Sequence, residues 1–171
     1  MASILKVNEI QSTSGNTGFT IATDGTPLPK ACAFQMYASS AQSITGSTEM
    51  TYEWDTVGFD THSITDASNN RVVITDATAG IWFLSFTSRL NNSVPFRHIN
   101  YIKVNSNTPI MFEETMYSQT TGASSSCTAS GFTSLVSGDV IIGRIYQQHS
   151  TTNTEYGISA GRLEGFRIGT T

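Results

Sequence analysis

The sequence predicts an all-β protein: a two-sheet antiparallel jelly roll of about ten strands, with a short extended N-terminal arm. First, no stretch of the 171 residues has the apolar period of a helix. Second, short apolar or alternating runs are separated by Gly, Asn, Ser and Asp. Third, only 13% of the residues are charged, while Ser, Thr and β-branched residues are abundant, a composition typical of β proteins.

The first thirty residues differ from the rest. Strand-like pieces at 4–10 and 18–22 flank the turn sequence SGNTG, and Pro27 and Pro29 then indicate a linker. This segment is too short to bury a core of its own. We therefore expect residues 1–30 to form an attachment arm and linker, and residues 31–171 to form the jelly-roll domain. The side chains expected to anchor the arm are those of Ile4, Val7, Ile10, Phe19 and Ile21.

Turn sequences divide the remaining chain into strands. DASNN, TDATAG and VNSNTP are typical turns, and VSGD predicts a tight hairpin connection. The Ser/Thr-rich stretch 118–130 predicts a solvated loop. The expected strands are 33–38, 51–55, 71–75, 80–90, 98–104, 109–118, 129–136, 139–147 and 156–168.

Several of these strands are apolar on both faces. Successive side chains of a strand point to opposite faces, so Ile81 and Phe83 share one face, and Trp82, Leu84 and Phe86 share the other. RVVIT and DVIIGRIY have the same property. Because an exposed apolar patch of several hundred Å² is unusual on a monomer, we expect one set to fill the core and neighbouring subunits to cover the other.

Composition excludes several partners. A net charge of -4 with only three lysines provides no basic patch for a nucleic acid. No apolar run approaches the about 20 residues of a membrane span, and the N-terminus lacks the apolar core of a signal peptide. We therefore expect cytoplasmic synthesis and no membrane partner. Free thiols are favoured at Cys32 and Cys127, with a bridge between them left open.

Motifs with catalytic or metal-binding chemistry are weak. GISAG at 157–161 matches the G-x-S-x-G pattern, but no helix or histidine is expected after it, so close backbone passage is favoured. The separated His62, His98 and His149 predict surface or loop positions. Glu113-Glu114 predicts a salt bridge, and DASNN lacks the Gly and distal Glu of a calcium loop. We expect no catalytic residue, no cofactor and no metal.

The strand sequences carry a family resemblance over about residues 31–171. NRVVITDATAG, AGIWFLSF, SGDVIIGRIY and, loosely, GRLEGFRIG resemble the jelly-roll domain of the complement globular-head and tumour necrosis factor superfamily. Trp82 stands where that family usually has Tyr. The resemblance implies a compact homotrimer in which one sheet of each subunit lies near the threefold axis. The candidates for this trimer contact are Trp82, Leu84, Phe86, Ile141 and Ile145.

The N-terminal segment resembles a second group of proteins. ASILKVNEIQSTSGNTGFTIATDGTPL is similar to the opening of many bacteriophage virion proteins, which begin with a short arm before a fibre, cement or decoration domain. This resemblance implies a non-enzymatic virion structural protein of a tailed phage, made in the host cytoplasm. We expect a trimeric capsid decoration, cement or short head-fibre protein, bound to the major capsid protein or another virion protein.

Alternative functions predict other features. A tail fibre or receptor-binding protein would use loops near 91–97, 118–128 and 147–156 to contact a host surface glycan or protein. A carbohydrate-acting enzyme would need two converging carboxylates, and a secreted signalling trimer would need a signal peptide. Head or tail location, any host receptor and an ion on the trimer axis stay open. The aromatic platforms of a receptor-binding protein would be Trp54, Tyr117, Tyr146 and Tyr156.

Overall fold

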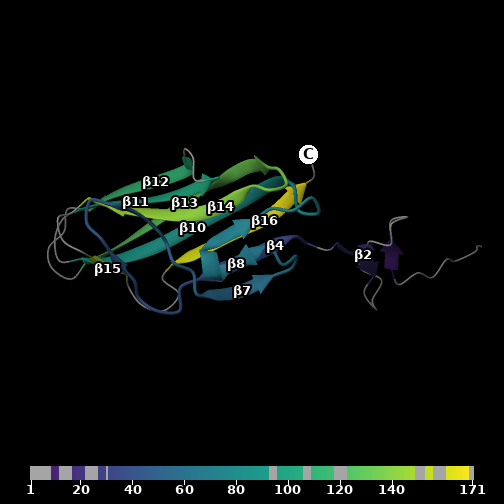
Figure 1. Cartoon of the computed structure of the whole chain (residues 1–171), viewed down its shortest axis with the longest axis horizontal. Helices are drawn as coiled ribbons and strands as arrows, with labels where there is room; N and C mark the ends of the chain where they lie inside the picture. The colour runs from purple at the N-terminus through teal and green to yellow at the C-terminus, as the bar shows by residue number, and fades with distance from the viewer. Residues whose placement is uncertain are drawn as a thin grey trace, which may run out of the picture. The chain divides into compact units, whose positions relative to one another are not determined.

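The computed structural model consists of strands joined by turns, with one short 3-10 helix in its described part (Figure 1). The chain divides into two compact units, Met1–Ala31 and Cys32–Thr171. The prediction of an all-β protein with two antiparallel sheets is confirmed by the second unit. The described residues are 9–11, 17–21, 27–29, 31–92, 96–105, 109–117, 123–148, 153–155 and 161–169.

The first unit contains a small antiparallel sheet in the order β1-β2-β3. β1 (Glu9–Gln11) and β3 (Pro27–Pro29) both pair with the central β2 (Thr17–Ile21). The Pro-containing linker of the sequence analysis is thus partly a strand. Its edge position suits proline, which has no N–H to donate to a second neighbour.

The expected arm anchors fall on this unit. Ile10 lies on β1, and Phe19 and Ile21 lie on β2. Ile4 and Val7 lie outside the described residues. Their role as anchors therefore stays a prediction.

The second unit has a seven-stranded sheet, which we call the large sheet. β10 is its centre, because residues 81–87 pair with β16 along one edge and with β13 along the other. The order continues from β16 through β4 to β7, and β15 and β5 extend the far end of β10. The strands are β4 (Ala33–Tyr37), β5 (Ser43–Ile44), β7 (Thr56–Asp60), β10 (Gly80–Asn92), β13 (Ala123–Leu135), β15 (Asn153–Glu155) and β16 (Arg162–Gly169).

The facing six-stranded sheet, called the small sheet, has the order β12-β11-β14-β9-β8, with β6 also paired to β14. A 3-10 helix, η1 (Ala67–Asn69), connects β8 to β9. The strands are β6 (Glu49–Thr51), β8 (Thr65–Asp66), β9 (Arg71–Val73), β11 (Phe96–Val104), β12 (Pro109–Tyr117) and β14 (Val140–Gln147).

The core between the two sheets is built from the residues expected at the trimer contact. Trp82, Leu84 and Phe86 project inward from β10, and Ile141 and Ile145 project inward from β14; all five are 0% exposed. These side chains are enclosed within one subunit, so their assignment to the trimer contact is wrong. Both faces of β10 are apolar, so its alternation could not show which set faces the core.

The sequence-based expectation does not include β5, β7, β8 and β15, and it differs from the structure at two further places. The strand predicted at 51–55 ends at Thr51, and Tyr52 and Trp54 beyond it are both buried in the core. The Trp54 backbone N–H donates to the Asn70 side chain at 2.7 Å, which replaces a ladder partner. The loop predicted at 118–130 is largely strand, since β13 pairs with β10 from Ala123 onward. Small Ser and Thr side chains suit a half-buried pleated surface.

The DASNN turn is confirmed, with a carboxylate at its centre. Asp66 accepts hydrogen bonds from Asn69 at 2.8 Å and Ser68 at 2.8 Å, and pairs with Arg71 at 2.9 Å. These bonds lower the pKa of Asp66 to about 2. Asn70 adopts the left-handed conformation with φ 54, which Asn tolerates better than most residues.

Candidate functional site

The outer face of the large sheet carries a row of three aromatic rings. Phe83 on β10 is in register with Phe132 on β13 and with Phe166 on β16. The Phe83 ring centroid lies 5.2 Å from that of Phe132 and 5.3 Å from that of Phe166. We call these residues the phenylalanine row. Phe132 is 67% exposed and Phe166 49% exposed, so the row lies in contact with water.

More apolar side chains surround this row. Ile81 shares the outer face of β10 with Phe83, while Phe59 on β7 lines a hollow beside Phe166. A solvated sheet face normally carries polar side chains at these positions. We call the part of the outer face that contains the phenylalanine row, Ile81 and Phe59 the apolar face. Exposed large hydrophobic side chains on the strands of the large sheet, or at their ends, are Val57, Phe59, Ile81, Phe132, Val136, Phe166 and Ile168.

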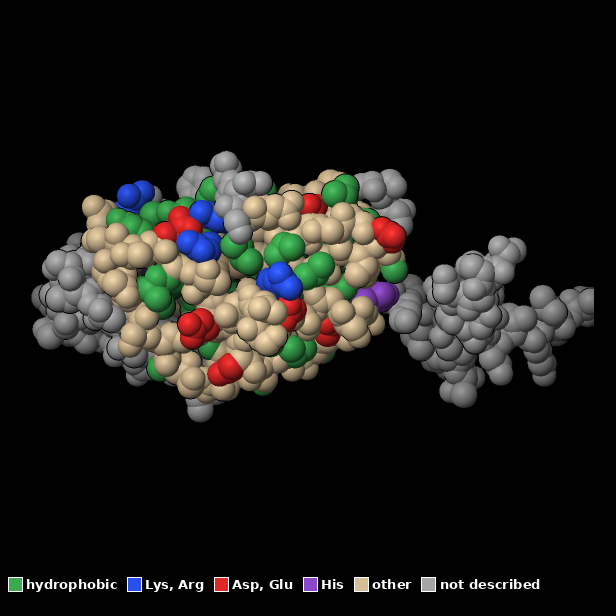
Figure 2. All heavy atoms as spheres, in the orientation of Figure 1, with side chains coloured by type: hydrophobic (Ala, Val, Ile, Leu, Met, Phe, Trp, Pro, Cys, Tyr) green, Lys and Arg blue, Asp and Glu red, His purple; other side chains and the backbone are tan. Residues whose placement is uncertain are grey.

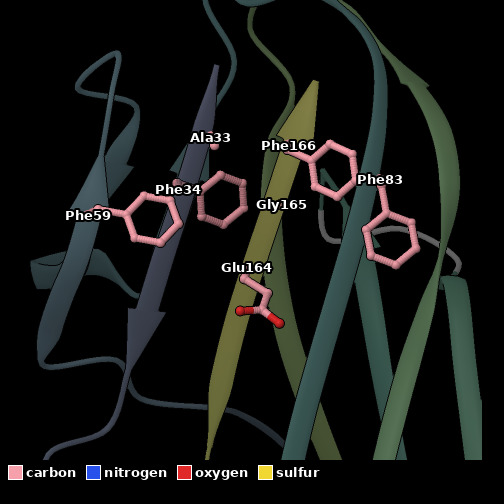
Figure 3. A pocket seen from close by; sticks show the side chains of 7 residues that line it. All are labelled: Ala33, Phe34, Phe59, Phe83, Glu164, Gly165 and Phe166. Atoms are coloured by element: carbon pink, nitrogen blue, oxygen red, sulfur yellow. The ribbon is translucent and has the colours of Figure 1, made fainter. Parts of the chain in front are cut away.

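A hollow lies in the apolar face between β7, β4, β16 and β10 (Figure 3). Gly165 lines the hollow with its backbone, because a Cβ there would point into the core, 2.7 Å from Leu84 and 2.9 Å from Phe34. The one ionisable side chain that lines the hollow is Glu164. The lining residues are Ala33, Phe34, Phe59, Phe83, Glu164, Gly165 and Phe166.

The other end of the same outer face is polar. The Thr87 and Thr128 hydroxyls lie 2.9 Å apart across β10 and β13. Arg162 is in register with Thr87 on the neighbouring strand. Figure 2 shows the sparse charge of the molecule on the face turned to the viewer, where acidic and basic side chains are few among uncharged ones. Apolar and polar side chains therefore divide the outer face along the strands.

A polar network crosses the core between the sheets. Asn100 on β11 donates to the carbonyl oxygens of Cys127 at 2.8 Å and Phe86 at 3.3 Å. Ser88 on β10 donates its hydroxyl hydrogen to Asn100 Oδ1 at 2.7 Å. The Ser88 oxygen must then accept from His98 Nε2, 2.9 Å away, because the hydroxyl has a single hydrogen. His98 therefore carries its ring proton on Nε2.

The Ser88–His98 contact has the residue types of an activated nucleophile but not the access. Ser88, His98 and Asn100 are each 0% exposed, so no substrate reaches them. Burial lowers the pKa of His98 to about 4, against an opposite effect of its bond to Asn100. The prediction that His98 lies on the surface is wrong. In β11 the polar His98 and Asn100 alternate with apolar Ile99. This alternation predicts that His98 and Asn100 face water, whereas they face the core.

The outer side of the small sheet carries an ion-pair cluster. Glu49 pairs with Lys103 at 2.6 Å and with Arg144 at 2.9 Å. Arg144 also donates to the Thr51 hydroxyl at 2.7 Å. These groups bind one another across β6, β14 and β11, so we assign the cluster to sheet pairing and not to a ligand.

The two expected receptor aromatics whose side chains the structure describes, Trp54 and Tyr146, do not form a shared surface platform. Trp54 is 1% exposed in the core, so its assignment as a surface platform is wrong. Tyr146 is partly exposed, Tyr117 belongs to β12, and Tyr156 lies outside the described residues.

The remaining candidates give no reactive site. Cys32 and Cys127 are buried and form no disulfide, as favoured by the sequence, and burial raises the pKa of the Cys32 thiol. Glu113-Glu114 lies on β12, whereas residues 157–160 of GISAG and His149 lie outside the described residues. Within the described ranges, no group of three His, Cys, Asp or Glu side chains could hold a metal ion. No helix among them is long and apolar enough to cross a membrane.

Comparison of the sequence with protein-family models and with curated proteins finds no match. Solved structures do match. The globular domain of zebrafish complement 1qA protein has a TM-score of 0.57 at 12% identity, over 82% of this chain and 99% of that chain. Eiger TNF from S. frugiperda has a TM-score of 0.61 at 10% identity, over 83% and 95%. Murine APRIL at pH 8.0 has a TM-score of 0.60 at 14% identity, over 81% and 100%.

These similarities are structural. At 10–15% identity they establish the fold and nothing of the activity. The second unit is therefore a jelly roll of the complement globular-domain and tumour necrosis factor type, as the sequence resemblance implied.

Proposed function

We propose that this chain is a non-enzymatic structural protein of a tailed-phage virion. In this proposal the jelly rolls assemble as a homotrimer through the apolar face, and the N-terminal unit of each copy attaches the trimer to the capsid. The protein then acts as a head decoration, cement or short head fibre. The sequence resemblance of residues 2–28 to phage virion proteins supports the location, and the jelly-roll fold supports the trimer.

The observation that carries the assembly is the phenylalanine row. Burying one such aromatic side chain is favourable by about 1.5–3 kcal/mol relative to leaving it in water. Three adjacent rings on one sheet face make a site that a second protein surface would cover. We favour a second copy of the chain as the partner that covers this face. In a ring with cyclic symmetry, each copy covers the apolar face of its neighbour, so no copy is left with that face in water.

Trimeric assembly also suits attachment. A closed trimer presents three identical N-terminal units, and binding of one unit raises the effective concentration of the other two. Weak individual contacts would then hold the trimer firmly. The net charge of -4 suits the outside of a capsid better than contact with packaged DNA.

An image of the virion that carries this chain tests the proposal. Electron cryomicroscopy at a resolution that shows individual strands is the measurement. We expect it to show jelly rolls in groups of three on the capsid surface. Density confined to the tail would overturn the capsid role. Absence of the chain from purified particles by mass spectrometry would overturn the virion role.

A further inference from the structure

The apolar face contains one carboxylate that a subunit contact would have to accommodate. We propose that Glu164 regulates the assembly: the charge of its carboxylate opposes burial of the apolar face, so that loss of that charge strengthens the contact between copies. This inference rests on the proposed function, because it takes a second copy of the chain as the occupant of the apolar face.

The position of Glu164 carries the inference. Its side chain lines the hollow together with Phe59, Phe83 and Phe166 (Figure 3). Glu164 lies two residues before Phe166 on β16, so both side chains point outward from the same strand. A chain that covers the phenylalanine row therefore reaches Glu164 as well.

The polar partners of Glu164 are few. Gln35 Nε2 on β4 donates to Glu164 Oε2 at 3.0 Å. Arg162 NH1 lies 3.9 Å from the same oxygen, with side-chain exposures of 46% for Arg162 and 39% for Glu164. In a single chain, water completes the solvation of this half-exposed carboxylate. A covering subunit would remove that water.

The surrounding strands do not replace the lost solvation. In register with Glu164, β10 presents Ser85 and β4 presents Gln35. Asp60 at the end of β7 accepts bonds from the Thr65 hydroxyl and the His62 backbone. Among the described side chains on this face, the other ionisable groups lie further along the strands: Arg89 on β10 and Tyr37 on β4.

Arg162 is therefore the nearest cation among the described residues that face Glu164. Desolvating a carboxylate is offset by an ion pair only when the geometry is close and the remaining lone pairs are bonded. A 3.9 Å contact is at the limit of an ion pair. The contact with Arg162 therefore offsets only part of the cost of burying the carboxylate.

Sedimentation equilibrium of the full chain tests the inference. Three proteins are compared at about pH 7.5: wild type, Glu164→Gln and Glu53→Gln. Glu164→Gln keeps the side-chain shape and removes the charge, and we expect its trimer to dissociate at roughly tenfold lower concentration than the wild-type trimer. Glu53→Gln makes the same change at an exposed site in the β6–β7 connection and should match the wild type.

A second arm uses Arg162. Arg162→Gln should weaken the wild-type trimer and leave the Glu164→Gln trimer unchanged, because the arginine then has no carboxylate to compensate.

The outcomes separate the two proposals. Equal or weaker association of Glu164→Gln, with native near-ultraviolet circular dichroism, would overturn the regulation by Glu164. Single chains at every concentration, in both wild type and Glu164→Gln, would instead overturn the proposed trimer. A trimer whose strength follows the Glu164 charge supports both.

Discussion

At the scale of single residues, the buried Ser88–His98–Asn100 network joins the two sheets through hydrogen bonds of 2.7–2.9 Å from Ser88 to the other two. A buried polar group is tolerable only when it is bonded. Each member here has a partner on the opposite sheet, and Asn100 reaches two backbone carbonyls of the large sheet. The network therefore constrains how the sheets align in addition to stabilising their packing.

The network predicts acid sensitivity. The unfolded chain binds a proton at His98 below about pH 6.5, whereas the folded chain binds it only below about 4. Stability is therefore lost as pH falls through this window, by about 3 kcal/mol in total. The measurement is the free energy of unfolding in urea at about pH 7.5, 6 and 4.5.

His98→Gln is the matched variant, since its amide preserves a donor to Ser88. It should be less stable at neutral pH and lose most of the dependence between about pH 6.5 and 4.5. Asp66, with its pKa lowered to about 2, affects stability below this window, because its unfolded value is about 3.9. An unchanged pH slope in His98→Gln would contradict the assignment.

Gly165 allows the second prediction at this scale. Gly165→Ala places a Cβ 2.7 Å from Leu84 and 3.0 Å from the Phe83 carbonyl oxygen, and the backbone atom cannot move aside. We expect destabilisation by about 1–3 kcal/mol in urea unfolding. Gly169→Ala on the same strand meets nothing within 4 Å and should stay within about 0.5 kcal/mol of the wild type. Equal effects of the two changes would refute this account of Gly165.

At the scale of elements, β10 separates the core from the candidate interface. Its inward residues complete the single-chain core, while its outward residues join β13 and β16 in the phenylalanine row. One strand thus serves two apolar environments. The register that aligns Phe83 with both Phe132 and Phe166 makes the outer surface contiguous.

This arrangement predicts that association and folding respond differently to one substitution. Phe132 is 67% exposed, so Phe132→Ser should change single-chain stability little. It should weaken trimer formation at least about tenfold in light-scattering chromatography. Ile110→Ser removes an apolar side chain that is 40% exposed on β12, in the small sheet, and should leave association unchanged. Loss of assembly in both variants would contradict the assignment of the subunit contact to the phenylalanine row.

At the scale of the whole molecule, the chain has two units with separate roles in the proposed function. Cys32–Thr171 contains the sandwich core, and Met1–Ala31 is a compact unit of its own. In the proposed function, assembly then depends on Cys32–Thr171 and attachment on Met1–Ala31. A variant that lacks one of these two functions can therefore be tested for the other.

Removal of residues 1–25 is expected to leave a folded, trimeric jelly roll that no longer binds virus particles. The readouts are circular dichroism and light scattering for the truncated protein, and co-sedimentation with particles that lack their own copy. The full chain provides the control for binding. Full occupancy of particles by the truncated protein would contradict the role of the arm and its expected anchors.

The sequence by itself determined the all-β class, the turns at DASNN, TDATAG and VSGD, and the presence of strands with two apolar faces, because each depends on local residue order. Only the tertiary structure decided which face of β10 is buried. Trp82, Leu84 and Phe86 meet Ile141 and Ile145 of the small sheet, so Ile81 and Phe83 remain outside. Strand alternation shows which side chains share a face. Which of the two faces is buried depends on the side chains of a strand that is distant in sequence. The contacts of His98 with Ser88 and of Trp54 with Asn70 were hidden for a similar reason, because in each pair the partner lies on another segment of the chain.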